Sequence, residues 1–138
     1  MQKLLIPALL FALMAVVGCS KSDDDQKLVN DSWFVSYYLE SDDKIEDTGL
    51  FSGYTFEFND NNEWIIYFPG GSSQTGKWDI DNAANTVSFA LDNPSAPMDG
   101  ILGEWELVAQ LDNGLSLKRK DASTNVFDEY SELTFTKQ

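Results

Sequence analysis

The chain has 138 residues, and its 23 acidic side chains outnumber its nine basic ones, which gives a formal net charge of −14. A protein this acidic repels phosphate backbones, so we expect no nucleic-acid partner, whereas a basic partner would suit it. The sequence has no histidine and one cysteine, which removes the most common general base and zinc ligand and excludes an internal disulfide. We therefore expect no enzyme, no cofactor and no metal site.

Residues 1–18 predict a lipoprotein signal peptide. Lys3 supplies a positive charge, and the nearly unbroken apolar run 4–17 has the length of a secretory signal but is short for a membrane-spanning helix. The run ends in Val16-Val17-Gly18-Cys19, which resembles a bacterial lipobox, where the signal is cut before the cysteine and the cysteine is acylated. We expect the mature chain to start at Cys19 and to be held at a membrane by lipid.

Residues 19–27 are small and charged and have no apolar face, so they predict a solvated tether. Within this tether, the run Ser22, Asp23, Asp24 and Asp25 resembles the acidic surface-export tract of one group of outer-membrane lipoproteins. A plain spacer is the alternative. Position and composition both favour the export tract, which predicts an outer-membrane protein exposed at the cell surface.

From residue 28 to residue 138 the chain predicts one all-β domain, because apolar and polar residues alternate with a period of two. Eight strands are expected, at 33–39, 54–58, 63–68, 76–80, 86–91, 103–110, 115–120 and 130–136. A short helical turn near 26–31 is also compatible with the sequence. Turn-forming residues separate most strands, as at 59–62 and 112–114. The simplest topology is an eight-stranded antiparallel up-and-down barrel, since closure removes both sheet edges.

The connections predict a barrel with two different ends. Three short turns fall at one end, whereas the long connections near 40–52 and 92–102 fall at the other. Such a barrel is a cup with a loop-rich mouth.

Eleven aromatic side chains fall on the expected inward faces: Trp33, Tyr37, Tyr54, Phe56, Phe58, Trp64, Phe68, Trp78, Phe89, Trp105 and Phe135. They form either a lumen for an apolar or sugar-like ligand or an ordinary core. An eight-stranded barrel is just wide enough to be filled by side chains or to hold one small molecule, and so many rings favour a filled or narrow interior. Nearest the mouth, Tyr37, Phe68 and Leu91 are the expected ligand-binding residues.

Arg119 is a fourth candidate at the mouth, on one face with Leu115 and Leu117. Pointing inward, it would need a carboxylate or an anionic ligand, because burying a lone guanidinium is very costly. A position at the rim that reaches water is favoured, since long cationic side chains extend toward solvent. Met98 is expected to pack within its loop rather than to cover the mouth. The run 79–82 begins like a calcium loop but lacks its later glycine and glutamate, so it predicts a turn.

Four segments carry a family resemblance: Leu28-Val29-Asn30-Asp31-Ser32-Trp33 and the stretches 51–59, 76–80 and 103–107. Together they resemble small lipocalin-like (calycin-type) domains of bacterial lipoproteins, over about residues 28–136. The resemblance implies a binding cup with Trp33 at its closed end. Asp31 stands where longer lipocalins have a glycine. The lipocalin arginine that packs over the first tryptophan has no counterpart in Arg119, which the topology places at the other end.

The leading hypothesis is therefore a non-enzymatic, lipid-anchored, lipocalin-like protein that binds a small apolar or amphipathic ligand at its mouth. The alternative is an inhibitor or adaptor that binds a basic protein, such as a lysozyme or protease, through the same loops.

Overall fold

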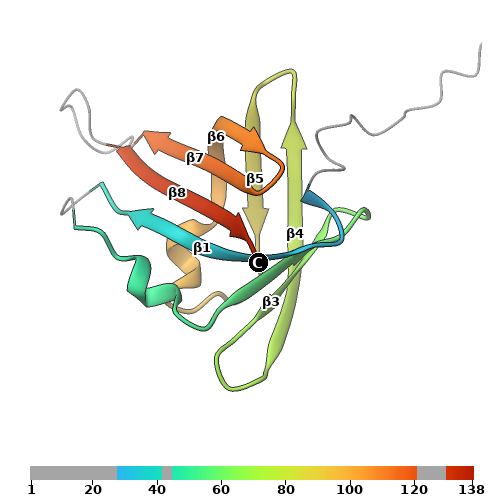
Figure 1. Cartoon of the computed structure of the whole chain (residues 1–138), viewed down its shortest axis with the longest axis vertical. Coiled ribbons are helices and arrows are strands. Elements are labelled where there is room, and N and C mark those ends of the chain that lie inside the picture. The colour runs from blue at the N-terminus through green and yellow to red at the C-terminus, as the bar shows by residue number, and fades with distance from the viewer. Residues whose placement is uncertain (1–27, 42–44, 121–129) are drawn as a thin grey trace, which may run out of the picture.

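The computed structural model describes residues 28–41, 45–120 and 130–138. They form a closed barrel in which each strand is antiparallel to the next and β8 returns to β1 (Figure 1). The strands are β1 (Ser32–Leu39), β2 (Thr55–Phe58), β3 (Glu63–Tyr67), β4 (Ser73–Asp81), β5 (Thr86–Ala90), β6 (Gly103–Leu111), β7 (Gly114–Lys120) and β8 (Tyr130–Lys137). Two short 3₁₀ helices, η1 (Thr48–Phe51) and η2 (Met98–Ile101), lie in the long connections. The predicted all-β barrel is confirmed.

Strand limits agree with the expected ranges to within one residue, except at β4. This strand begins at Ser73 rather than Gly76, because the polar segment 73–75 still pairs with β3 although it lacks the alternation of a half-buried strand. The helical turn considered near 26–31 begins outside the described residues. Within them, Val29 forms a bridge with Phe58, and Asn30 has a positive φ.

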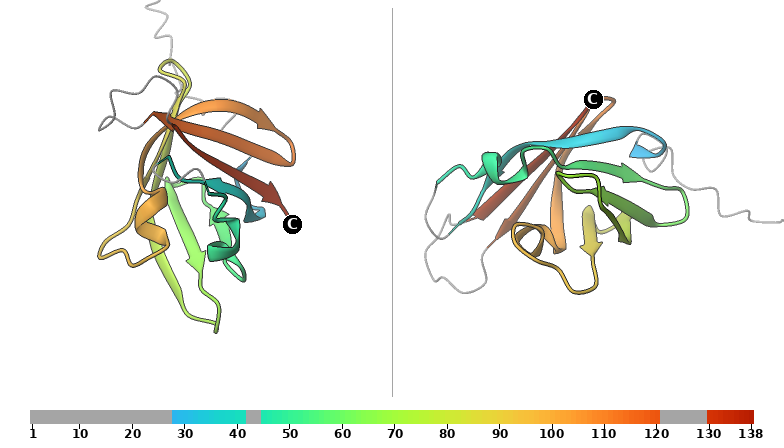
Figure 2. Two further views of the ribbon diagram at one scale, coloured as in Figure 1. Left: turned by 90° about the vertical axis from the view of Figure 1, so that its left-hand side faces the viewer. Right: turned by 90° about the horizontal axis from the view of Figure 1, so that it is seen from below.

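The two ends of the barrel differ as expected. Short turns join β2 to β3, β4 to β5 and β6 to β7 at one end, while η1 and η2 belong to connections at the other. In Figure 1, β4 and β5 stand nearly upright whereas β1 and β8 run across the view, so the two sides of the barrel cross steeply. Both views of Figure 2 show η1 lying beside β1.

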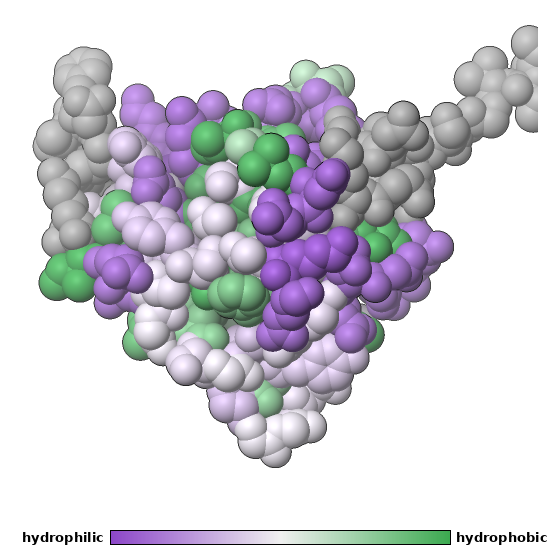
Figure 3. Space-filling view, in the orientation of Figure 1, coloured by the Kyte–Doolittle hydropathy of each residue, from purple (hydrophilic) through white to green (hydrophobic). Residues whose placement is uncertain are grey.

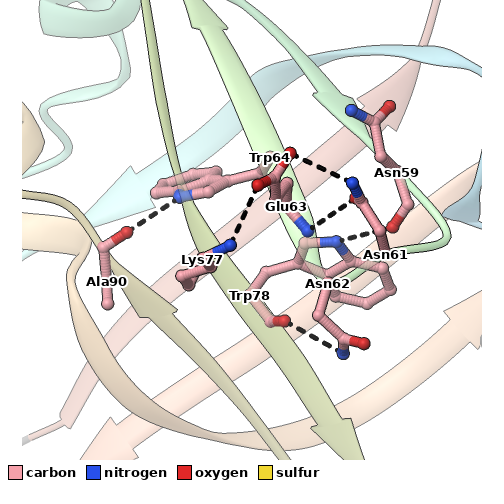
Figure 4. Close-up of polar contacts among 8 residues, drawn as sticks. All are labelled: Asn59, Asn61, Asn62, Glu63, Trp64, Lys77, Trp78 and Ala90. Atoms are coloured by element: carbon pink, nitrogen blue, oxygen red, sulfur yellow. Dashed lines mark hydrogen bonds and ion pairs between the residues drawn. The ribbon is translucent and has the colours of Figure 1, made fainter.

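All four tryptophans of the chain donate their indole N–H to a backbone carbonyl. At the closed end, Trp33 donates to Leu28 (3.1 Å) and Trp78 donates to Asn59 (3.1 Å). Figure 4 shows Trp78 held by the asparagine-rich β2–β3 turn, where the Asn62 amide donates to the Trp78 carbonyl (3.3 Å). Buried indoles with satisfied N–H groups fix the rings as structural elements of the interior.

Two β-bulges shift the inward face by one residue. In β1 the bulge lies between Val35 and Tyr37, and in β6 it lies between Leu107 and Ala109. Beyond each bulge the expected alternation is wrong: Ala109 pairs with the outward Ser116 rather than facing the core. The alternation of apolar and polar residues does not reveal the inserted residue of a bulge. The segments before and after the bulge each keep a period of two, and only the face that points inward changes.

The seam between β1 and β2 is the least regular part of the barrel. These strands pair at only two positions, Ser32 with Glu57 and Trp33 with Phe56, whereas β1 pairs with β8 at six. Farther along β1, η1 takes the place of a paired strand, and the Thr48 hydroxyl accepts the Tyr38 N–H at 2.8 Å.

Candidate functional site

The interior of the barrel is filled by its own aromatic rings. Trp64 stacks on Phe56 with centroids 5.9 Å apart and lies 4.9 Å from Phe89. Phe58 meets Phe135 edge to face at 5.8 Å. These five rings are all at most 3% exposed. Of the two interpretations of the inward aromatics, the ordinary core therefore applies to this part of the barrel.

Toward the loop-rich end, four rings form a continuous edge-to-face series that we call the aromatic row. It runs from Tyr38 to Phe51 (5.2 Å between centroids), on to Tyr54 (6.0 Å) and to Phe68 (5.6 Å). Tyr38 and Phe51 are buried, whereas Tyr54 and Phe68 are half-buried and pack against the core. The predicted ligand-binding residue Phe68 thus ends the row.

The other mouth candidates have different surroundings. Leu91 is only 9% exposed and belongs to the core. Met98 and Ile101 of η2 are also buried, and both belong to the core cluster of the barrel. Ligand binding by Leu91 stays a prediction, and it would require contact through a nearly buried side chain.

Tyr37 does not share the inward face of Trp33 and Val35, so that expectation is wrong. The β1 bulge gives the inward position to Tyr38, which is 1% exposed. The Tyr37 side chain lies outside the barrel, where partial desolvation and the neighbouring carboxylates Glu132 and Glu46 raise the pKa of its hydroxyl. Tyr37 is therefore separated from Phe68 and Leu91 by the barrel wall.

Arg119 points inward and does not reach out as a rim residue. Its guanidinium lies 4.2 Å from the Trp105 ring centroid and donates to the carbonyls of Gly100 and Leu102. We expected an inward Arg119 to need a carboxylate or an anionic ligand. A π face and two backbone carbonyls are among the partners of this cation, and the Glu40 carboxylate lies close by, bonded to the Tyr38 hydroxyl beside the same Gly100 carbonyl. The tryptophan beneath it is Trp105, not Trp33, and the contacts hold η2 against the barrel.

Tyr38 forms a second polar contact beside η2. Its hydroxyl donates to Glu40 Oε1 at 2.7 Å and lies 3.4 Å from the Gly100 carbonyl oxygen. Burial and the hydrogen bond to the Glu40 carboxylate raise the pKa of Tyr38 far above its usual range. A Cβ atom at Gly100 would lie 2.6 Å from the Tyr38 hydroxyl, so only glycine allows this close approach.

A groove of about 440 Å³ opens where β1 and β2 part, and we call it the β1–β2 groove. Its floor includes the buried residues Val35 and Phe51, and its sides include the half-buried rings of Phe34 and Tyr54. The face seen in Figure 3 carries β1, β8 and η1, with weakly polar and apolar residues left of its centre and a band of strongly hydrophilic residues just right of it. The groove shares Phe51 and Tyr54 with the aromatic row.

The outer face of β4, β5 and β6 carries an acidic wall made of Asp79, Asp81, Glu104 and Glu106. In the strand register, Asp79 and Glu104 flank Ser88, and Asp81 and Glu106 flank Thr86. All four carboxylates are exposed, and Lys118 lies 3.6 Å from Glu106. Beside the wall, a shallow groove of about 410 Å³ includes Asn62, Lys77 and Ser88 in its lining. Asp79 and Asp81 thus belong to strand β4, and the turn of this hairpin lies at 82–85 rather than at 79–82 as expected.

The predicted lipidation site Cys19 and the predicted export tract Ser22, Asp23, Asp24 and Asp25 lie outside the described residues. Within the described ranges, no helix is long and apolar enough to cross a membrane. The same residues contain no group of three or more His, Cys, Asp or Glu side chains arranged to hold a metal ion.

Sequence reasoning missed the part of the site built by η1. Phe51 lies in a long connection, where strand alternation gives no inward or outward assignment. A usable signal is the apolar pair Leu50-Phe51 between two small polar dipeptides, Thr48-Gly49 and Ser52-Gly53. An apolar pair inside such a connection indicates a loop that folds back onto the core.

Comparison with known proteins supports the fold. A scan against protein families and a search of curated proteins found no match. The crystal structure of a lipocalin-like protein from Bacteroides uniformis superposes with a TM-score of 0.57 at 11% sequence identity, covering 81% of this chain and 99% of that one. A duf4847 family protein from Bacteroides vulgatus gives 0.52 at 12% identity, with coverages of 81% and 95%. This chain therefore has the fold of an eight-stranded, lipocalin-like β-barrel.

Proposed function

We propose that this protein is a lipid-anchored binding protein that takes a small apolar or amphipathic ligand at the surface of its loop-rich end. The observation that carries the proposal is the aromatic row. Its buried members join the core, while Tyr54 and Phe68 keep exposed ring surface at the mouth. Rings held in place by edge-to-face contacts offer an apolar ligand contact area at little entropic cost.

The composition favours binding over catalysis. The sequence has no histidine, and its single cysteine is the proposed acylation site. Histidine, the most common general base, and the cysteine thiol are therefore missing from the ligand-binding region we propose.

The ligand proposal is tested by fluorescence titration with Nile red, a neutral apolar dye whose emission rises in apolar surroundings. We expect saturable binding of one dye per protein that changes little between 50 mM and 500 mM salt, because apolar contacts are not screened. Emission that stays at the level of the free dye would contradict the proposal.

Membrane attachment is a separate part of the proposal. It is supported by the apolar run 4–17 and by the lipobox-like end at Cys19. We expect Cys19→Ser to move the protein from the membrane fraction to the soluble fraction, and retention in the membrane would contradict acylation.

Surface display rests on the tract Ser22 to Asp25. Replacing Asp23, Asp24 and Asp25 with alanine should abolish antibody labelling of intact cells while leaving the protein in the outer-membrane fraction. Unchanged labelling would show that the tract is only a spacer.

A second candidate function is the binding of a basic protein, as an inhibitor or adaptor. The acidic wall favours it, because four exposed carboxylates on the two strands that flank β5 attract and steer a basic surface. A basic lysozyme is a suitable probe. Binding that weakens steeply with salt and is lost when the four carboxylates are neutralised would support this function rather than ligand binding alone.

A further inference from the structure

We propose that the β1–β2 groove is the binding site for a neutral amphipathic small molecule with a ring-sized apolar part. This inference rests on the proposed function and names the place and chemistry of the ligand. It places binding at an opening in the wall of the barrel.

The groove exists because β1 and β2 do not pair along their full length. β1 and β2 pair at only two positions near the closed end, and η1 occupies the space between them beyond that point. Contacts from the η1 segment replace the missing partner of β1: the Asp47 N–H donates to the Tyr38 carbonyl (2.8 Å), and the Thr48 hydroxyl accepts from the Tyr38 N–H. These hydrogen bonds hold the η1 segment against β1, so the seam does not need a side chain in the groove for its stability. Its volume of about 440 Å³ falls in the range of roughly 300–1,000 Å³ typical of small-molecule sites.

The floor of the groove reaches the hydrophobic core. Val35 is 5% exposed and Phe51 is 3% exposed, and both belong to the core cluster. Phe34 and Tyr54 are half-buried and stand beside this floor. An apolar ring placed here would contact aromatic faces and edges that are already fixed by packing, which limits the entropic cost of binding.

The side chains at the edge of the groove are polar and uncharged. Thr48, Ser52 and Thr55 supply hydroxyl groups, and Gln138 supplies a side-chain amide. No acidic or basic side chain is among the described residues that line it. The ligand class follows from this lining: an apolar body for the floor and neutral hydrogen-bonding groups for the edge. An anionic headgroup is disfavoured, since the chain carries a net charge of −14.

Gly49 is a position at which a side chain can be added beside the groove. Gly49 lies in its lining, and a Cβ atom built there would have no heavy atom within 4 Å. The backbone at Gly49 is outside the left-handed region, so a larger side chain can be placed there without backbone strain. Gly49→Leu is therefore expected to fill the groove from η1 without disturbing the core.

The test is a Nile red titration of the full chain and three variants. Gly49→Leu and Ser52→Phe each add apolar bulk at the groove, and Gly114→Leu adds the same bulk at the closed end, where the nearest heavy atom to a new Cβ is 3.9 Å away. We expect the two groove variants to weaken dye binding at least tenfold and Gly114→Leu to leave it within about twofold. Melting temperatures of all four proteins establish that each is folded.

The outcomes separate the two proposals. Saturable binding that survives unchanged in folded Gly49→Leu and Ser52→Phe would overturn the groove while leaving ligand binding by the protein in place. Absence of saturable dye binding by the wild-type chain would overturn the proposed function and the groove together. Equal loss in the groove variants and in Gly114→Leu would also overturn the groove, because the effect would not depend on position.

Discussion

The interior around Trp64 and the seam around η1 use aromatic rings in different ways. Inside, Phe56, Phe58, Trp64, Phe89 and Phe135 lie against one another and are at most 3% exposed. At the seam, Phe34 and Tyr54 keep part of their surface open beside a groove. An eight-stranded barrel has room for a filled core or for one small ligand. This difference underlies our proposal that the interior provides stability and that the ligand binds in the wall.

The largest expected effect comes from truncating the interior. Trp64→Ala would remove a ring that contacts Phe56, Phe58 and Phe89 and would leave the Ala90 carbonyl without its indole donor. We expect a loss of about 3–5 kcal/mol in the free energy of unfolding, measured by urea denaturation. Val108→Thr, at a position 56% exposed, serves as control and should change it by no more than about 0.5 kcal/mol. A loss below about 1 kcal/mol for Trp64→Ala would mean that the interior is not tightly filled.

The next largest effect is expected from replacing a glycine in the packed wall, compared with replacing a glycine at the seam. A Cβ atom at Gly76 would collide with the Ala90 carbonyl and the Trp64 indole, whereas one at Gly49 would meet nothing. Gly76→Ala should therefore destabilise the protein by about 1–3 kcal/mol, and Gly49→Ala should be neutral or stabilising by up to about 1 kcal/mol. Thermal melting of both variants checks the pair. A larger loss of stability for Gly49→Ala than for Gly76→Ala would contradict the assignment of a packed wall at Gly76 and an open seam at Gly49.

Arg119 connects the interior to the loop-rich end. Arg119→Met would leave the Gly100 and Leu102 carbonyls without the guanidinium and would remove the cation above Trp105. We expect a loss of about 1–3 kcal/mol in the free energy of unfolding and faster amide exchange in η2. Lys120→Met, at an exposed neighbour on the opposite face, is the matched control. Unchanged exchange in η2 would show that Arg119 does not hold this helix in place.

The smallest expected effect is a pH dependence from Tyr38. Burial and Glu40 raise the pKa of this hydroxyl in the folded state. Below pH about 10, tyrosine is protonated in both the folded and the unfolded chain. Above that pH the unfolded chain loses the proton first, so the free energy of unfolding falls as the pH rises. Denaturation at pH 8 to 11.5 should show a shallower fall for Tyr38→Phe than for the wild type. Identical slopes would contradict the raised pKa.

The strands were predictable from sequence because each buried position repeats every second residue, and one face of each strand must be apolar. The alternation placed Trp64, Ile66, Phe89 and Phe135 inside, and the structure has them there. It failed at Tyr37, since two adjacent tyrosines give no sign of which one follows the bulge.

The candidate site was less predictable because it depends on contacts between distant segments. Arg119 was correctly grouped with Leu115 and Leu117, yet its carbonyl partners lie 17 and 19 residues earlier, in and just after η2. The groove depends on how far β1 pairs with β2 before η1 intervenes. Neither the partners of Arg119 nor the extent of the β1–β2 pairing can be read from the alternation of apolar and polar residues within one strand.

The four indole N–H groups give the most direct test of the claim that the ligand stays outside a filled barrel. Each has its own NMR signal, and each reports one part of the interior through its bond to a backbone carbonyl. On titration with Nile red, we predict shifts in the amide signals of residues 34–35 and 48–55, with all four indole signals unchanged. Shifts of the Trp64 and Trp33 indole signals, with the amides of η1 unaffected, would contradict the account.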